Sequence, residues 1–292
     1  MIEVLSPGPL ATVQDLGRPG FADLGVSRSG AADRGALRLA NRLVGNADSA
    51  AGLEITLGGL VLRLAGAATL ALTGAPCPLS GHRAGGWNTA LSCPAGSVLA
   101  LGVPPAGLRS YLGIRGGIAV SPVLGSAATD TLSGLGPAAL RAGDRLPVGT
   151  ATVAEPGDFA YPAGRPVPPG PVGLAAGPRA SWFPPAALRQ LFGSSWLVGP
   201  DSNRVGLRLD GPALRQRPET EQQAAELPSE PTLPGAVQVP PDGRPIVLGP
   251  DAPVTGGYPV IAVVRTAELD LLAQLRPGDR LRFMAPPGHW PC

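Results

Sequence analysis

The chain has 292 residues, which is enough for one large domain or two of ordinary size, and its hydrophobic content of 44% can build well-packed cores. Its formal net charge is only +2 and its basic residues form no run, so nucleic acid is not expected as a partner. No apolar stretch approaches the roughly 18 residues of a membrane helix, and Glu3 stands where a signal peptide has its basic region. We therefore expect a soluble cytoplasmic protein with no membrane partner.

The basic residues exclude several kinds of chemistry, because all 23 are arginine. Without lysine there is no P-loop lysine, no Schiff-base lysine and no residue to carry covalent biotin, so another polypeptide must supply any of these. Two histidines, His82 and His289, cannot build a multi-histidine metal site, and the three cysteines show no paired spacing. We expect neither a metal site nor a disulfide framework.

The first half of the chain is predicted to consist of short strands around a single helix. Residues 35–44 carry apolar side chains at helical spacing, with Ser29 or Asp33 as the N-cap. Residues 53–64 predict a hairpin that turns at Gly58-Gly59. Further strands are expected at residues 69–72, 98–103 and 111–114.

The second half predicts two short helices and six strands. The helices are expected at residues 184–192 and 267–275, with Thr266 as the N-cap of the latter. Asp242-Gly243 between two apolar runs is a strong hairpin signal. The strands are expected at residues 196–198, 205–209, 237–239, 246–248, 260–264 and 281–284.

The two halves carry a repeated phrase. Residues 140–146 read LRAGDRL and residues 275–281 read LRPGDRL, and each places a Gly-Asp turn before a strand. The alternative is a common turn-strand phrase that occurs twice by chance. Residues 151–179 contain seven prolines, as a connector would. We therefore expect a mainly β fold with an N-terminal β-barrel module at 1–150, a linker at 151–179 and a C-terminal β-barrel module at 180–292.

One polar cluster precedes the first helix and consists of Gln14, Asp15, Arg18 and Asp33. A guanidinium can grip a carboxylate or a phosphate through two parallel hydrogen bonds, and either aspartate could act as a base or orient the arginine. We assign Asp15 and Arg18 to catalysis, and Gln14 and Asp33 to substrate binding. The alternative is a structural Asp–Arg pair that holds a long loop.

A second polar cluster lies in the Gly- and Pro-rich segment of the second half. Catalysis is assigned to Asp251. Substrate binding is assigned to Arg204, Gln238, Thr255, Gly256, Gly257 and Tyr258, with Arg208 nearby. Glycines let backbone amides approach an anion. We expect Arg18 and Arg204 to bind an anionic substrate group in a cleft that both halves line; the alternative is a turn-rich β domain whose glycines and prolines only shape loops.

Several ordered blocks resemble one known family, the allophanate hydrolase subunit 2 family. The blocks are residues 10–20 (LATVQDLGRPG), 29–34 (SGAADR), 39–46 (LANRLVGN), 53–59 (LEITLGG), 72–75 (LTGA) and the segment 229–261. Two positions depart from the family pattern: Asn203 stands where members usually have Asp, and Pro253-Val254-Thr255 replaces a frequent Gln-Thr-Thr. If these groups contact the substrate, the departures change substrate choice or activity. If the groups only cap turns, the departures have no effect on either.

The resemblance implies two tandem cyclophilin-like β-barrel modules with a few short helices. It also implies a component of a prokaryotic ATP-dependent 5-oxoprolinase, a hydrolase that converts 5-oxoproline to glutamate, in which this chain is the C subunit and acts with the A and B subunits. ATP, with or without Mg²⁺, would then be shared with the B-type partner, and this chain alone would be inactive. Two alternatives stay open: carboxyl transfer from carboxybiotin to urea or another amide, and a non-catalytic regulator that binds a kinase-inhibitor protein.

Overall fold

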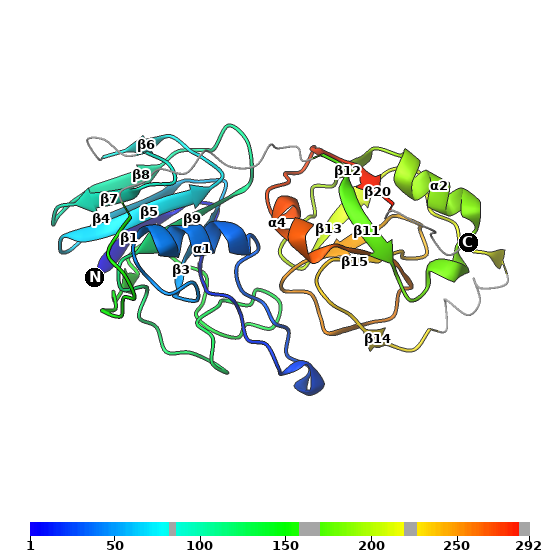
Figure 1. Cartoon of the computed structure of the whole chain (residues 1–292), viewed down its shortest axis with the longest axis horizontal. Coiled ribbons are helices and arrows are strands. Elements are labelled where there is room, and N and C mark those ends of the chain that lie inside the picture. The colour runs from blue at the N-terminus through cyan, green and yellow to red at the C-terminus, as the bar shows by residue number, and fades with distance from the viewer. Residues whose placement is uncertain (82–85, 158–169, 219–226, 286–292) are drawn as a thin grey trace. The chain divides into compact units, whose positions relative to one another are not determined.

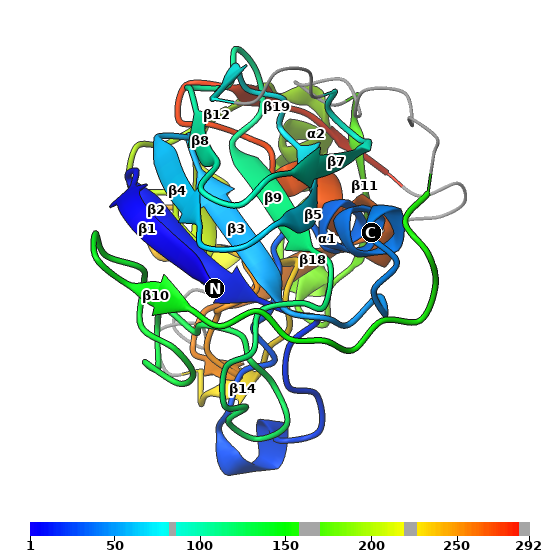
Figure 2. The same ribbon diagram turned by 90° about the vertical axis from the view of Figure 1, so that its left-hand side faces the viewer.

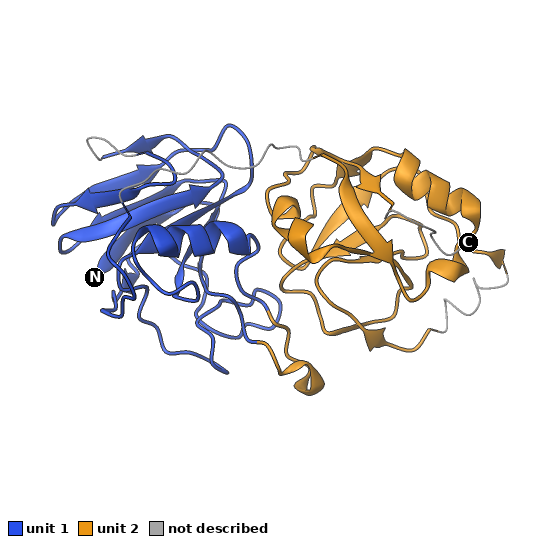
Figure 3. Cartoon of the chain, viewed as in Figure 1, with its two compact units in different colours: residues 1–18, 29–167 blue, residues 19–28, 168–292 orange. Residues whose placement is uncertain are grey.

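The computed structural model describes residues 1–81, 86–157, 170–218 and 227–285 (Figure 1). The chain divides into two compact units (Figure 3). Unit 1 comprises Met1–Arg18 and Ser29–Val167, and unit 2 comprises Pro19–Arg28 and Pro168–Cys292. Residues 19–28 belong to unit 2 because of their contacts with residues far along the chain. The local sequence therefore does not predict this assignment.

Unit 1 is built from two five-stranded antiparallel sheets (Figure 2). The first sheet has the order β10-β1-β4-β8-β6, with bounds Arg145–Leu146, Ile2–Pro7, Leu60–Leu64, Val98–Leu101 and Leu79–Ser80. The second has the order β2-β3-β9-β5-β7, with bounds Leu10–Gln14, Gly52–Thr56, Arg109–Ile114, Ala68–Gly74 and Ala90–Cys93. Both sheets contribute to one hydrophobic core.

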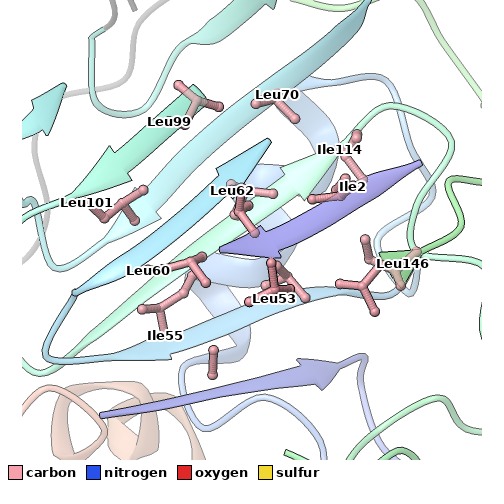
Figure 4. Close-up of a cluster of buried hydrophobic side chains, with 14 of the residues drawn as sticks. Ile2, Leu53, Ile55, Leu60, Leu62, Leu70, Leu99, Leu101, Ile114 and Leu146 are labelled. Atoms are coloured by element: carbon pink, nitrogen blue, oxygen red, sulfur yellow. The ribbon is translucent and has the colours of Figure 1, made fainter. Parts of the chain in front are cut away.

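The core of unit 1 follows from the alternation of side chains along each strand. Ile2 and Val4 of β1, Leu60 and Leu62 of β4, and Leu53 of β3 are all fully buried. Figure 4 shows these strands directing their apolar side chains into the same space. Burial of each such side chain contributes about 1.5–3 kcal/mol, so the core provides the main stabilisation of the unit.

The helix α1, Arg34–Leu43, covers β5 and β9 (Figure 2). Its buried residues Leu37, Ala40 and Leu43 recur at the predicted helical spacing. Every residue of β9 is buried, because the core covers one face of this strand and α1 contacts it as well. The prediction of a helix at this position is confirmed within one residue at each end.

The hairpin predicted at residues 53–64 is wrong. Both strands exist, but β3 pairs with β2 and β9, while β4 pairs with β1 and β8. Leu57, Gly58 and Gly59 all have positive φ, at 59°, 69° and 76°, in the turn that carries the chain from one sheet to the other. A Gly-Gly pair fits a hairpin equally well, and only the distant pairing partners decide between the two.

Unit 2 contains one eight-stranded sheet that nearly closes into a barrel. Its order is β19-β12-β13-β16-β15-β18-β11-β20, with bounds Arg280–Leu281, Trp196–Val198, Gly206–Asp210, Ile246–Leu248, Ala236–Gln238, Val260–Val264, Val172–Ala176 and Phe283–Met284. The two end strands, β19 and β20, are separated only by Arg282 in the sequence. A second core, which includes Trp196 and Phe183, lies within this unit.

The predicted elements of unit 2 are mostly present. The hairpin at Asp242-Gly243 joins β15 to β16, which pair antiparallel. Helix α2, Pro185–Gly193, is confirmed, whereas Thr266 does not cap a single long helix: it begins the 3-10 turn η3, Thr266–Glu268, and α4 is only Leu269–Leu272. The remaining elements are the 3-10 turns η1 at Ala22–Leu24 and η2 at Ala180–Trp182 and the two-stranded ribbon of β14, Glu230–Pro231, with β17, Thr255–Gly256.

The repeated phrase forms the same turn twice. The Asp144 carboxylate accepts a hydrogen bond from the Arg141 amide at 2.7 Å, and the Asp279 carboxylate accepts one from the Arg276 amide at 2.8 Å. Gly143 and Gly278 both have a φ of 92°, which glycine adopts without strain. The strands that follow, β10 and β19, then pair with β1 and β12.

The mainly β fold with few helices is confirmed. Strand β11 lies inside the range 151–179 that the sequence suggested as a linker, so the last residues of that range belong to the sheet of unit 2. Among the described residues, no helix is long and apolar enough to cross a membrane.

Candidate functional site

Asp15 anchors the loop that follows β2. Its carboxylate accepts hydrogen bonds from the Gly17 amide at 2.7 Å, the Ser126 hydroxyl at 2.6 Å and the Ala127 amide at 2.7 Å. The residue is only 8% exposed. Three donors on one carboxylate fix its position and hold this loop against residues 126–127.

Arg18 is buried at the end of the same loop, with 1% of its surface exposed. Its Nε donates to the Val123 carbonyl at 3.4 Å, and its Nη2 donates to the Ala128 carbonyl. Its Nη1 has no hydrogen-bond partner, and no ion pair to Arg18 occurs among the described residues. The structural Asp–Arg pair is therefore not what holds this guanidinium; two carbonyl groups do.

Gln14 is fully buried on β2, just before the loop that carries Arg18. Its Nε2 donates to the Thr12 hydroxyl at 3.1 Å and to the Thr129 carbonyl at 2.9 Å. The Gln14 Oε1, the Thr129 Oγ1 and the Arg18 Nη1 are buried and have no hydrogen-bond partner among the residues that the structure describes. Unpaired buried polar atoms are costly, and these three lie on two short segments that contact each other.

Asp33 is the N-cap of α1, and its carboxylate accepts from the Ala36 amide at 2.8 Å. Its own amide donates to the Tyr111 hydroxyl at 2.8 Å, which in turn donates to Glu54 at 2.7 Å. Burial, reinforced by Glu54 and Asp33, raises the pKa of Tyr111 well above its ordinary value. Glu54 also forms an ion pair with Arg109 at 3.4 Å.

Sequence reasoning missed the Glu54, Arg109 and Tyr111 network. Each of these residues sits on a strand, where it reads as an ordinary alternating polar or aromatic residue. The one available signal is that Glu54 belongs to a block that resembles the family.

Arg204 and Asp251 face each other in unit 2 and are almost completely buried, at 2% and 0% exposure. The guanidinium donates from Nε and Nη2 to the two carboxylate oxygens, both at 2.8 Å. The structure thus brings these two predicted residues together, but the guanidinium of one is already paired with the carboxylate of the other. A bidentate buried pair of this kind fixes the loops at residues 200–205 and 249–252 relative to each other.

Gln238, Gly256 and Tyr258 form a second contact group in unit 2. The Gln238 Nε2 donates to the Tyr258 carbonyl at 3.4 Å. A Cβ atom on Gly256 would lie 2.5 Å from the same Nε2, so a larger residue here would displace the end of the Gln238 side chain. Thr255 and Gly257 are exposed, and Tyr258 is 45% exposed.

The departure at Asn203 has a local explanation. Its Oδ1 accepts hydrogen bonds from the amides of Val205 at 2.8 Å and Gly206 at 3.4 Å. An aspartate would do the same, so Asn203 acts here as a turn cap.

The remaining expectations concern a shared cleft, metals and histidines. The cleft shared by Arg18 and Arg204 stays a prediction, because the two residues belong to different units. No group of three metal-binding side chains occurs within residues 1–81, 86–157, 170–218 and 227–285. His82 and His289 lie outside these ranges.

A family model matches most of the chain. The model described as carboxyltransferase domain, subdomain A and B, matches residues 24–285. The chain belongs to this family. The resemblance found in the sequence blocks is thereby confirmed.

Relatives of the chain carry two kinds of name. A protein of Escherichia coli K12, named as the C subunit of 5-oxoprolinase, is 40% identical over 97% of this chain and 91% of its own length. A Haemophilus influenzae protein of the same name is 33% identical over 98% of this chain and 91% of its own length. The crystal structure of the K. lactis urea amidolyase superposes with a TM-score of 0.87 at 32% identity, over 97% of this chain but only 18% of that much longer one.

Proposed function

We propose that this chain is the C subunit of an ATP-dependent 5-oxoprolinase, a complex that hydrolyses 5-oxoproline to glutamate. The observation that carries the proposal is the match to the Escherichia coli protein of that name, which extends over 97% of this chain and 91% of the other. The much longer urea amidolyase contains a similar segment as 18% of its length, so its activity as a whole does not transfer.

The chemistry requires activation of a poor electrophile. Nitrogen donates electron density into the lactam carbonyl, so phosphorylation of the carbonyl oxygen from ATP would make the ring carbon open to water. A transition state of phosphoryl transfer spreads negative charge over oxygens, which guanidinium and backbone amide donors stabilise. The B subunit is proposed to complete this site, with Mg²⁺ held between the two proteins, and the A subunit to open the ring.

Arg18 is our candidate for the charge-stabilising group. Its Nε and Nη2 are held by carbonyl groups, so the guanidinium is already oriented, and its buried Nη1 lacks a partner. Such a cation attracts an anion strongly, because folding has already removed its water. Arg204 is less suited to the role, because Asp251 occupies its guanidinium. We propose that this pair holds the loops at residues 200–205 and 249–252 of unit 2 together.

Carboxyl transfer from carboxybiotin to an amide is the second candidate, and the family description favours it. Since the chain has no lysine, the biotin would sit on another polypeptide. A gene for a biotin carboxylase next to this one would support carboxyl transfer, whereas a gene for a ring-opening protein would support 5-oxoprolinase.

Reconstitution tests the proposal. The chain is purified alone, with the B subunit, and with both the A and B subunits, and 5-oxoproline-dependent ADP release is measured in each sample. We expect a stable complex with the B subunit on size-exclusion chromatography and turnover only in the complete mixture. Full turnover by the isolated chain, or a chain that stays monomeric beside the B subunit, would refute the proposal.

A further inference from the structure

Unit 2 contains a cavity of about 530 Å³, and its lining includes Tyr258 and Arg208 of the second polar cluster but no other residue of either cluster. Its walls are the turn after β12, the strand β13 and the hairpin between β15 and β16. A volume of this size is within the range of sites for small molecules.

The charged side chains of this cavity fall into two groups. Arg244 is occupied, since it forms an ion pair with Asp210 at 3.0 Å, and Asp242 accepts a hydrogen bond from the Arg244 amide at 3.0 Å. The side chains of Arg208 and Asp201, and the hydroxyl group of Tyr258, have no hydrogen-bond or ion-pair partner within the described part of the chain. One cation, one anion and one phenol are therefore available to a ligand.

The total charge of the lining decides which ligands fit. Two arginines and three aspartates give the cavity a formal charge of −1. A triphosphate, with several negative charges, would be repelled by the aspartates. A small ligand with a single carboxylate can pair with Arg208 while it offers an N–H group to Asp201 and a carbonyl oxygen to Tyr258.

We infer that this cavity binds a small carboxylate that also carries an amide, with Arg208 as the carboxylate anchor, Asp201 as the acceptor for the amide N–H and Tyr258 as the donor to the carbonyl. The choice of 5-oxoproline among small carboxylates that carry an amide rests on the proposed function; the rest of the inference does not. 5-Oxoproline carries all three complementary groups: a carboxylate, a ring N–H and a carbonyl oxygen.

Calorimetric titration with three probes tests this assignment on the full chain and on its complex with the A and B subunits. The probes are 5-oxoproline, 2-pyrrolidinone, which is the same lactam without the carboxylate, and ATP. We expect 5-oxoproline to bind, 2-pyrrolidinone to bind at least about tenfold more weakly, and ATP not to compete. Arg208→Ala should weaken 5-oxoproline binding about tenfold or more, and Tyr258→Phe about fivefold.

Arg280→Ala is the matched control, since Arg280 is an exposed arginine of β19 that does not line the cavity. It should bind like the unchanged chain. The assignment is overturned if 5-oxoproline binds to neither sample, if Arg208→Ala binds it normally, or if 2-pyrrolidinone binds equally well. If the Arg208→Ala complex hydrolyses 5-oxoproline with an unchanged KM, the cavity is not the binding site, but the proposed function stands. If 5-oxoproline binding depends on Arg208 but the unchanged complex forms no glutamate, the proposed function is wrong, but the cavity remains a binding site.

Discussion

At the scale of single residues, the decisive fact is which polar groups are already occupied. The sequence groups Asp15, Asp33, Arg204 and Asp251 as reactive or binding residues, and each of them is engaged in two or more interactions that hold a loop or cap a helix. Arg18 differs, because its buried Nη1 has no partner in the described part of the chain. Sequence patterns identify such residues but cannot reveal their distant partners: Ser126 and Ala127, which donate to Asp15, lie more than 100 positions away.

Arg18→Ala is expected to lower the turnover of the reconstituted complex by roughly 10²-fold, on the scale of losing one donor to a developing negative charge. The change also leaves the Val123 and Ala128 carbonyls without their donor, so the free energy of unfolding should fall by about 1–3 kcal/mol. The measurement is activity per folded molecule, with the exposed Arg63→Ala as the control. Normal activity per folded molecule would show that Arg18 contributes to stability and not to catalysis.

Asp251→Ala is expected to destabilise unit 2 by about 3–5 kcal/mol, because it leaves the buried Arg204 charge without a counter-charge. The double change Arg204→Met/Asp251→Leu should recover most of that loss, since no charge then remains in the buried site. Denaturant unfolding of both single variants and the double variant measures the coupling. If the effects simply add, the pair is not the brace that we propose.

Tyr111 should make the chain sensitive to alkaline pH. Its pKa is raised in the folded state, so its contribution to stability is fully present below its unfolded pKa of about 10 and is lost as the pH rises further. The difference in unfolding free energy between the unchanged chain and Tyr111→Phe should therefore shrink as the pH rises from about 10 to about 11. A difference for Tyr111→Phe that stays constant over this range would contradict the assigned burial and hydrogen bonds.

At the scale of elements, local sequence patterns predict the bounds of single strands but not which strands pair. The strands at residues 196–198, 246–248 and 260–264 are found with the predicted bounds, because compact apolar runs are bounded there by turn residues. The predicted pairing of β3 with β4 is wrong, because strand partners are chosen by contacts far along the chain. The first strand, β1, was missed, although its buried Ile2 and Val4 alternate with less buried residues as in a half-buried strand.

The twin turns provide a test at this scale. Asp144→Ala and Asp279→Ala remove the same side-chain-to-amide hydrogen bond from equivalent turns in the two units. Each change is expected to cost about 1 kcal/mol of unfolding free energy, while the exposed Asp23→Ala should cost little. A loss at only one of the two turns would contradict their structural equivalence.

At the scale of the whole molecule, the chain consists of two β units with a candidate polar site in each. Among the residues that the structure describes, there is no metal-binding cluster, and the sequence has no lysine and no Walker pattern. We propose that activity belongs to a complex, because two relatives of this chain are named as one subunit of 5-oxoprolinase. The match along nearly the full length of the Escherichia coli 5-oxoprolinase protein supports the choice of that complex.

The measurement that tests this claim most directly is the product ratio of the complex formed with the A and B subunits. Purified complex is supplied with 5-oxoproline and ATP, and glutamate and ADP are quantified in the same samples, in parallel with urea and bicarbonate as the alternative substrates. We predict about one glutamate for each ADP and no urea-dependent ADP release, since one phosphoryl transfer activates one lactam. ADP release that depends on urea and bicarbonate, with no glutamate formed from 5-oxoproline, would contradict the claim.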